Sequence, residues 1–305
     1  MAKLTRREML QAGLAAATAA AVPSLARGEV RTVQKTTFKL RYAPHFGMFQ
    51  NHAEDDLDQV RFAADEGFTA WEDNGMAGRS REFQETFAKL MAEKKMQMGI
   101  FVAHSIDWQN PSLTAGNKGI EDKFVADIKN STEVAKRIDA KWVTTVLGRV
   151  AQNMPMGHQI ANVVKALRRA AEVCEPSGMV MVVEPLNWRD HPGMFGATSD
   201  ILRAVCEAAN HPSVKILQDL YHLQVTEGNL IDNMNRSWEH IAYFQTGDNP
   251  GRNEPGTGEV NYRNVFKHIH SRGFTGILGM EHGASKPGKE GERAVIDAYR
   301  AADNY

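Results

Sequence analysis

The sequence predicts an α/β fold, a single-domain (β/α)8 TIM barrel over residues 38–305. Short apolar runs alternate with amphipathic segments of helical length and never take the close spacing of hairpins, which is typical of a parallel sheet. Eight such strand–helix units follow one another. The span of about 250 residues that they occupy is usual for a (β/α)8 barrel, whereas a doubly wound sheet more often has five or six strands.

The first half of the chain supplies four of these units. Its expected strands are the apolar runs at Lys39–Ala43, Thr69–Glu72, Met96–Ala103 and Trp142–Leu147. Three helices are predicted from apolar residues that share one face: Leu57, Val60 and Ala64 at 54–66; Phe83, Phe87, Leu90 and Met91 at 80–94; and Phe124, Ile128, Ala135 and Ile138 further on. Gly67 follows the first helix and is a typical C-terminal stop.

The second half repeats the alternation. Its expected strands are Met179–Glu184, Val214–Asp219, Ile241–Gln245 and Thr275–Glu281, and its expected helices are 157–175, 199–209, 230–238, 262–271 and 290–302. The first of these strands is almost entirely apolar, as a strand covered on both faces should be. The only two cysteines, Cys174 and Cys206, fall on apolar helix faces, so we expect small buried side chains and no disulfide framework.

Residues 1–26 have the layout of an export signal. Thr5-Arg-Arg-Glu-Met-Leu10 precedes an apolar run from Ala12 to Val22, and a small-residue end follows at Ser24-Leu-Ala26. We therefore expect a twin-arginine signal peptide with cleavage near Ala26, a linker at 27–37 and a periplasmic location. Retention of the uncleaved leader as an anchor is the alternative. The apolar run is shorter than the roughly 20 residues that a membrane span requires, so no span is expected in the mature chain.

Charge argues against nucleic-acid partners. The formal net charge is −1, and removing the leader takes away more basic than acidic residues. Binding to nucleic acid would normally require a basic stripe, and the sequence contains none. The expected partner is a small molecule, a sugar or a hydroxy-keto acid. A homo-oligomer is compatible with the sequence, which leaves the oligomeric state open.

Four consecutive strands end in acid or amide oxygens: Glu184, Asp219, Gln245 and Glu281. In a barrel these ends converge on one axis, so the side chains should meet. Three carboxylates in one pocket disfavour one another's ionised form unless a cation or a proton compensates them. Four oxygen ligands without cysteine suit a divalent ion such as Mg²⁺, Mn²⁺ or Co²⁺, so the sequence predicts a metal site here.

Other polar residues near the strand ends are candidate substrate contacts. His222 follows Asp219 by three residues, and Arg252 lies in a Pro-Gly-Arg turn of the loop 245–262. Asp190, Trp188 and His104 follow other strands. For each of the last three residues an ordinary loop or packing role is the commoner alternative. The glycines at 254–259 lack the lysine and the spacing of a phosphate-binding loop, so we expect a rigid turn instead.

Three motifs make the chain similar to the hydroxypyruvate isomerase family, within the wider xylose isomerase-like barrels. They are Glu184-Pro-Leu-Asn187, Asp219-Leu-Tyr-His-Leu-Gln224 and Asp248-Asn-Pro-Gly-Arg-Asn-Glu-Pro-Gly-Thr-Gly-Glu-Val-Asn-Tyr262. The resemblance implies that Glu184, Asp219, Gln245 and Glu281 bind the metal and that the two glutamates form the acid/base pair. It also implies that His222 and Arg252 contact the substrate.

The implied reaction is isomerisation of a small α-hydroxy aldehyde or ketone by proton transfer through an enediolate. The chain departs from the family at Trp188 after strand five, at Lys286 after strand eight, and at Trp71-Glu-Asp-Asn-Gly75. A periplasmic ketose 3-epimerase, or a 3-keto-glycoside epimerase or lyase, could use the same metal and glutamate pair and is the main alternative. A non-catalytic sugar-binding barrel is a further alternative. An apurinic endonuclease is disfavoured because the predicted cluster is not rich in histidine.

Overall fold

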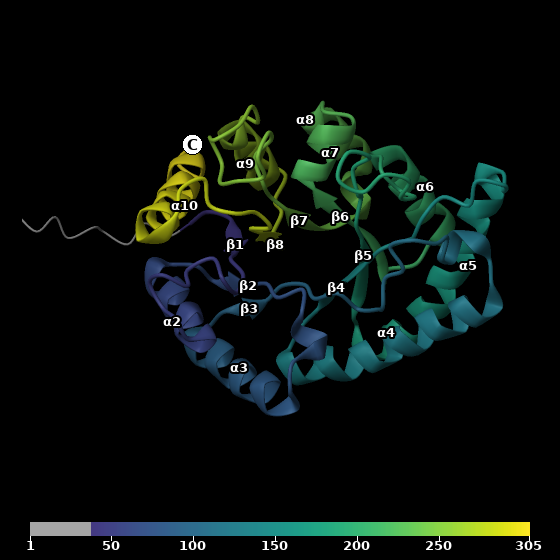
Figure 1. The fold of residues 1–305 in the computed structure, drawn as a ribbon, viewed down its shortest axis with the longest axis horizontal. Helices are drawn as coiled ribbons and strands as arrows, with labels where there is room; N and C mark the ends of the chain where they lie inside the picture. Colours follow the sequence, from purple (N-terminus) through teal and green to yellow (C-terminus); the bar gives the residue numbers. More distant parts are fainter. Residues whose placement is uncertain (1–37) are drawn as a thin grey trace, which may run out of the picture. The chain divides into compact units, whose positions relative to one another are not determined.

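Residues 38–305 are described by the computed structural model of the protein (Figure 1). The predicted signal peptide at 1–26 and linker at 27–37 lie outside these residues. Among the residues described, no helix is both long enough and apolar enough to cross a membrane.

Eight parallel strands form the barrel. They are β1 Arg41–Ala43, β2 Ala70–Trp71, β3 Gln97–Met98, β4 Trp142–Thr145, β5 Val180–Val183, β6 Val214–Asp219, β7 Ile241–Gln245 and β8 Ile277–Gly279. Six of them pair in the order β1-β8-β7-β6-β5-β4, and β2 pairs with β3. Single parallel bridges, His45 with Glu72 and Val102 with Thr144, join these two sheets and close the ring. The predicted (β/α)8 fold is confirmed.

Helices surround the strands, as Figure 1 shows. They are α2 Asp56–Glu66, α3 Arg81–Lys94, α4 Lys118–Ile138, α5 Met156–Cys174, α6 Ser199–Ala209, α7 Leu220–Thr226, α8 Leu230–Ser237, α9 Tyr262–Ser271 and α10 Gly288–Ala302. Short 3-10 turns lie at η1 Met76–Gly78, η2 Leu113–Ala115, η3 Glu175–Ser177 and η4 Trp238–His240. The apolar helix faces pack on the outside of the strands in one continuous core, which includes Cys174 and Cys206 as buried free thiols.

A separate apolar layer fills the barrel interior, and each strand region supplies one residue to it. Its members are Ala43, Ala70, Ile100, Trp142, Val182, Leu217, Tyr243 and Ile277. Side chains alternate between the two faces of a strand, so the residue two positions further along also points inward. That step leads from Leu217 to Asp219 and from Tyr243 to Gln245. The apolar layer therefore lies directly beneath the polar residues at the strand ends.

Helix α7 was not predicted from the sequence. It begins directly after Asp219, whose carboxylate accepts a hydrogen bond from the backbone N–H of His222 at 2.9 Å. A side-chain oxygen in this position satisfies one of the N–H groups left open at a helix start. Asp219 is thus both the last residue of β6 and the N-cap of α7, so the strand passes into the helix without a loop.

Candidate active site at the carboxyl ends of the strands

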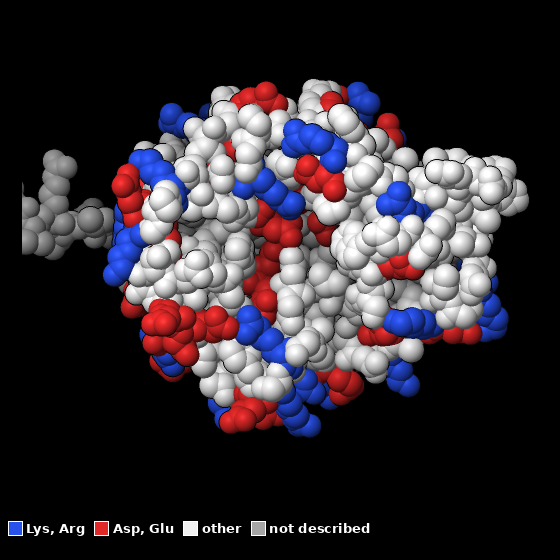
Figure 2. Space-filling model, in the orientation of Figure 1, with Lys and Arg blue, Asp and Glu red and all other residues white. Residues whose placement is uncertain are grey.

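The four residues predicted as metal ligands stand at the carboxyl ends of neighbouring strands. Asp219 and Gln245 are direct partners across β6 and β7, and Gln245 is the partner of Gly279 across β7 and β8. Glu184 follows β5, and Glu281 lies two residues beyond β8. Figure 2, drawn in the same orientation as Figure 1, shows acidic side chains at the bottom of a hollow at the centre of the molecule.

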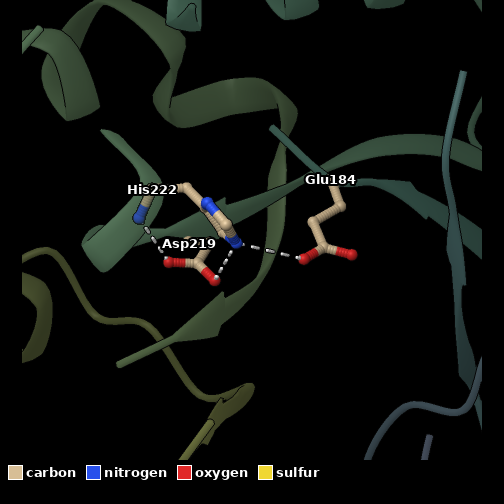
Figure 3. Close-up of side chains that lie close together, drawn as sticks. All are labelled: Glu184, Asp219 and His222. Atoms are coloured by element: carbon tan, nitrogen blue, oxygen red, sulfur yellow. Dashed lines mark hydrogen bonds and ion pairs between the residues drawn. The ribbon is translucent and has the colours of Figure 1, made fainter. Parts of the chain in front are cut away.

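Glu184, Asp219 and His222 come close together (Figure 3). The Nε2 atom of His222 lies 3.9 Å from a carboxylate oxygen of Glu184 and 3.8 Å from one of Asp219. One ligand atom from each of the three residues can be chosen so that all lie within 4.8 Å of one another. His222 and Asp219 are almost completely buried, and 11% of the Glu184 side chain is exposed.

The hydrogen bonds of His222 decide which of its nitrogens carries the proton. Its Nδ1 accepts from the backbone N–H of Asn187 at 3.1 Å. Burial lowers the pKa of His222 to about 4, so the ring is neutral near pH 7. A neutral ring whose Nδ1 accepts carries its proton on Nε2. The face of His222 toward Glu184 and Asp219 is therefore an N–H donor, which suits contact with a substrate oxygen better than coordination of a cation.

Arg252 lies against two of the acids. Its Nη2 is 2.6 Å from Glu281 Oε2 and 3.3 Å from Asp219 Oδ2, and its Nε donates to the backbone oxygen of Glu281 at 3.0 Å. The guanidinium also stacks over the ring of Tyr221, 4.7 Å from its centre. Asn74 donates to the other carboxylate oxygen of Glu281 at 2.8 Å. Glu281 is therefore held from two sides.

The loop 245–262 holds Arg252 in an uncommon backbone conformation, with a φ of 50°. A left-handed conformation of this kind costs a non-glycine residue free energy and persists only where its surroundings fix it. Here Arg252 N donates to Asp248 O at 2.8 Å, and Gly283 N donates to Arg252 O at 3.0 Å. The buried Asp248 carboxylate accepts from the N–H groups of Gly256 and Val260. The loop is thus bonded within itself and to the segment after β8.

A further polar residue of the site, Glu72, was not among the predicted site residues. It follows β2, is buried in the barrel interior, and accepts hydrogen bonds from Tyr243 Oη and Gln245 Nε2, both at 2.8 Å. The sequence did carry a signal for it, because Ala70-Trp71-Glu72 has the same inward–outward–inward alternation as the other strand ends. The segment Trp71–Gly75 thus places a buried acid beside the predicted metal ligands.

Crowding of the acids shifts their ionisation. Burial raises the pKa of Glu184 well above its usual range, and the nearby charges of Glu281 and Asp219 raise it further. Burial also raises the pKa of Glu72, with a further contribution from the charge of Glu281. Burial raises the pKa of Glu281 to about 7, although the charge of Arg252 opposes this shift. The single positive charge of Arg252 does not balance the negative charge that these acids would carry together if all were ionised.

The residues fit a divalent cation. The Oε1 atom of Gln245 is buried and has no hydrogen-bond partner among residues 38–305. A buried polar atom without a partner is costly, and a cation would satisfy it. The set of Glu184, Asp219, Gln245 and Glu281 offers oxygen atoms alone, which hard divalent ions prefer. A bound cation would also relieve the repulsion between the carboxylates.

The remaining predicted substrate contacts, Asp190, His104 and Trp188, differ in how far they are already engaged in contacts within the protein. Asp190 accepts from Asn187 Nδ2 at 2.9 Å and from Tyr221 Oη at 2.7 Å, and such hydrogen bonds lower its pKa to about 2 despite partial burial. Both ring nitrogens of His104 are engaged by backbone groups, at Ser105 O and Val146 N. Trp188 is 60% exposed. In this conformation only Trp188 offers an uncommitted surface, while Asp190 and His104 brace their neighbours.

Aromatic rings line one side of the mouth. Trp108 stacks on His191 with their ring centres 5.4 Å apart, and His191 lies 5.4 Å from His222. Trp71, by contrast, is completely buried in the outer core and lines no mouth. Two partly buried glutamates of raised pKa, an N–H donor at His222 and a guanidinium at Arg252 make an arrangement that can remove a proton from carbon and stabilise the oxygen charge that results.

Comparisons with known proteins agree with the fold. The family model of the xylose isomerase-like TIM barrel matches residues 60–302. The chain is 28% identical to hydroxypyruvate isomerase of Escherichia coli over 71% of its own length and 84% of that protein. It is 29% identical to 2-oxo-tetronate isomerase of Cupriavidus necator over 79% of its own length and 92% of that protein.

Among solved structures, the chain is similar to an AP endonuclease, family 2, from Brucella melitensis. The TM-score is 0.73 at 24% sequence identity, and the match covers 83% of this chain and 96% of the other. A likeness at this identity concerns the fold. It agrees with the barrel that the strand order and the bridges establish.

Proposed function

The chain belongs to the xylose isomerase-like TIM barrel family, and from this premise we propose that it is an isomerase of a small α-hydroxy aldehyde or ketone that depends on a divalent metal ion. Relatives named hydroxypyruvate isomerase and 2-oxo-tetronate isomerase support the reaction class. The observation that carries the proposal is the pair Glu184 and Glu281. Both are glutamates of raised pKa at strand ends that flank Asp219 and Gln245.

In this proposal the two glutamates move the proton. One removes a proton from the carbon that bears the hydroxyl group, and the other delivers a proton to the neighbouring carbon, with an enediolate between the two steps. A carboxylate whose pKa is raised toward neutrality is a stronger base than an ordinary glutamate and is still partly ionised near pH 7. The pKa of about 7 for Glu281 falls in this range.

Glu184, Asp219, Gln245 and Glu281 would hold the metal ion, Mg²⁺, Mn²⁺ or Co²⁺. When bound, the ion supplies electrostatic stabilisation of negative charge on the substrate oxygens. His222 adds a hydrogen bond to a substrate oxygen through its Nε2–H. Arg252 orients Glu281 through its side chain and backbone and adds positive charge beside the reacting oxygens.

Exchange of carbon-bound hydrogen tests the proposal. Metal-loaded protein is incubated in D₂O with hydroxypyruvate, with 2-oxo-tetronate and with several ketoses, and deuterium at carbon is followed by NMR. An isomerase delivers deuterium to the carbon that originally carried the carbonyl group and yields an aldose–ketose pair. An epimerase returns deuterium to the carbon from which the proton left and inverts it. If a substrate binds but its carbon-bound hydrogen does not exchange with solvent, the protein is a sugar-binding barrel and not an isomerase.

We also propose that the protein acts in the periplasm after twin-arginine export, on the strength of Thr5–Leu10 and the apolar run that follows. Replacing Arg6 and Arg7 by lysine should leave the protein in the cytoplasm, whereas the unchanged protein should appear in the periplasmic fraction with an N-terminus near residue 27. Equal periplasmic amounts of both proteins would rule out this route.

A further inference from the structure

Glu72 forms the centre of a buried hydrogen-bonded chain beneath the site. Tyr243 Oη donates to its Oε2 and Gln245 Nε2 donates to its Oε1, each at 2.8 Å. All three side chains are almost completely buried, and Tyr243 belongs to the apolar layer of the barrel interior. The chain therefore runs from that apolar floor to one of the proposed metal ligands.

Two glycines leave room for the hydrogen-bonded side chains of Glu72 and Tyr243. A Cβ atom on Gly279 of β8 would lie 1.9 Å from Glu72 Oε2, and a Cβ atom on Gly99 would lie 2.3 Å from Tyr243 Oη. Gly279 is the direct strand partner of Gln245, so its missing side chain opens the inward position beside Gln245. The carboxyl group of Glu72, which comes from β2, occupies that opening.

The contact determines how the amide of Gln245 is oriented. Glu72 accepts at both carboxyl oxygens, Oε2 from Tyr243 Oη and Oε1 from Gln245 Nε2, so its contact with the amide is made through the NH₂ group. With Nε2 directed at Glu72, the oxygen of the planar amide points elsewhere, and Oε1 is the buried atom without a partner.

We propose that Glu72 is a positioning residue that fixes the Gln245 amide so that its oxygen faces the metal ion. The inference rests on the proposed function, in which Gln245 is a ligand. Residues that orient a metal ligand typically change metal affinity or activity by about 10–100-fold when they are replaced. A glutamine at position 72 has the same shape but can donate as well as accept, so it no longer selects one orientation of Gln245.

The test measures Mn²⁺ binding by calorimetry and, separately, the thermal unfolding of the metal-free protein. For Glu72→Gln we expect Mn²⁺ affinity to fall by about 10–100-fold. We expect the unfolding midpoint of the metal-free protein to stay the same or rise, because replacing a buried acid by a neutral group of the same shape removes a desolvation cost. Gly279→Ala, which pushes the Glu72 carboxyl away, should weaken Mn²⁺ binding in the same way.

Glu121 provides a matched control. It is also a buried glutamate, 4% exposed, but it pairs with Lys165 and Arg169 between α4 and α5. Glu121→Gln should lower the unfolding midpoint and leave Mn²⁺ affinity unchanged. A purely structural role for Glu72 would give the same pattern in Glu72→Gln, a lower midpoint with unchanged affinity, and would overturn the inference.

Gln245→Ala separates the inference from the proposed function. If the unchanged protein binds Mn²⁺, Gln245→Ala weakens binding and Glu72→Gln does not, the positioning role is wrong and the metal site stands. If Gln245→Ala binds Mn²⁺ as well as the unchanged protein does, Gln245 is no ligand and the inference falls with that assignment. If the unchanged protein does not bind Mn²⁺, both the metal site and the inference are overturned.

Discussion

Arg252 bonds to Glu281 twice, with its Nε on the backbone oxygen at 3.0 Å and its Nη2 on the carboxylate at 2.6 Å. Because one bond is to the backbone and the other to the side chain of Glu281, the two bonds fix the position of the carboxylate relative to the backbone of that residue. Only a guanidinium, with several donors in a rigid plane, can make both bonds at once. The pairing therefore sets where the proposed acid/base group stands.

Arg252→Lys should lower kcat by roughly 10–100-fold, because a lysine ammonium keeps the charge but cannot reproduce both bonds, and one charge-assisted bond contributes about 1.5–3 kcal/mol. Steady-state kinetics with the substrate identified by deuterium exchange would measure the change. Arg61→Lys, in an exposed pair with Asp58, is the control and should be neutral. Full activity in Arg252→Lys would mean that Glu281 needs no such support.

Glu281→Gln should reduce kcat by about 10²–10⁴-fold, the usual contribution of a positioned acid or base, and should abolish deuterium incorporation at carbon. Circular dichroism would check that the fold is retained. Glu290→Gln, an exposed residue that pairs with Lys286, is the matched control and should retain activity. Deuterium exchange at the normal rate in Glu281→Gln would remove this residue from the acid/base pair.

Much of the fold and part of the site could be predicted from the sequence, for a physical reason. Alternating strands and amphipathic helices determine a barrel with few competing architectures, and Glu184, Asp219 and Gln245 each end an apolar strand that must point its last residue inward. Glu72 ends the predicted strand Thr69–Glu72 but was not linked to the site, because its partner Tyr243 has the pattern of an ordinary apolar strand residue.

Other features depend on contacts between distant segments. The proton position of His222 follows from the backbone of Asn187, 35 residues away in the sequence. The engagement of Asp190 by Tyr221 and of His104 by Val146 likewise joins segments that no local pattern connects. Helix α7 was missed because Asp219 is both a strand end and a helix cap, and a strand pattern conceals a cap.

The stability of the metal-free protein should depend on pH through Glu281. Its pKa in the folded protein is raised to about 7, above the ordinary value, so its stabilising contribution is present at low pH and is lost as pH rises toward 7. Glu281→Gln removes this loss. The variant should match the unchanged protein near pH 4.5 and exceed it by roughly 2–3 kcal/mol in unfolding free energy at pH 8.

Urea unfolding of both metal-free proteins across this pH range would measure the difference. Both proteins share histidines such as His104 and His282, whose pKa burial lowers to about 4, so that background cancels in the comparison. A difference that is constant with pH would show that Glu281 ionises at its ordinary pKa in the folded protein.

Adding Mn²⁺ to metal-free protein should raise the unfolding midpoint, and the rise should be larger at pH 8 than at pH 6. Carboxylates must lose their protons to bind a cation, and those at this site have raised pKa values, so protons compete with the metal in this range. Differential scanning calorimetry with and without EDTA would measure both midpoints. An equal rise at both pH values would place the cation away from Glu184 and Glu281.

His222→Asn separates a substrate donor from a metal ligand. The asparagine oxygen can stand near the position of Nδ1 and accept from Asn187 N, while the donor at Nε2 is lost. If Nε2 carries the proton, as the 3.1 Å bond from Asn187 requires, Mn²⁺ affinity should change by less than about threefold and kcat/KM should fall by about 10–100-fold. Asp219→Asn gives the scale for loss of a true ligand. If the Mn²⁺ affinity of His222→Asn falls as far as that of Asp219→Asn, then His222 binds the cation together with Glu184 and Asp219, and Gln245 loses its place as the fourth ligand.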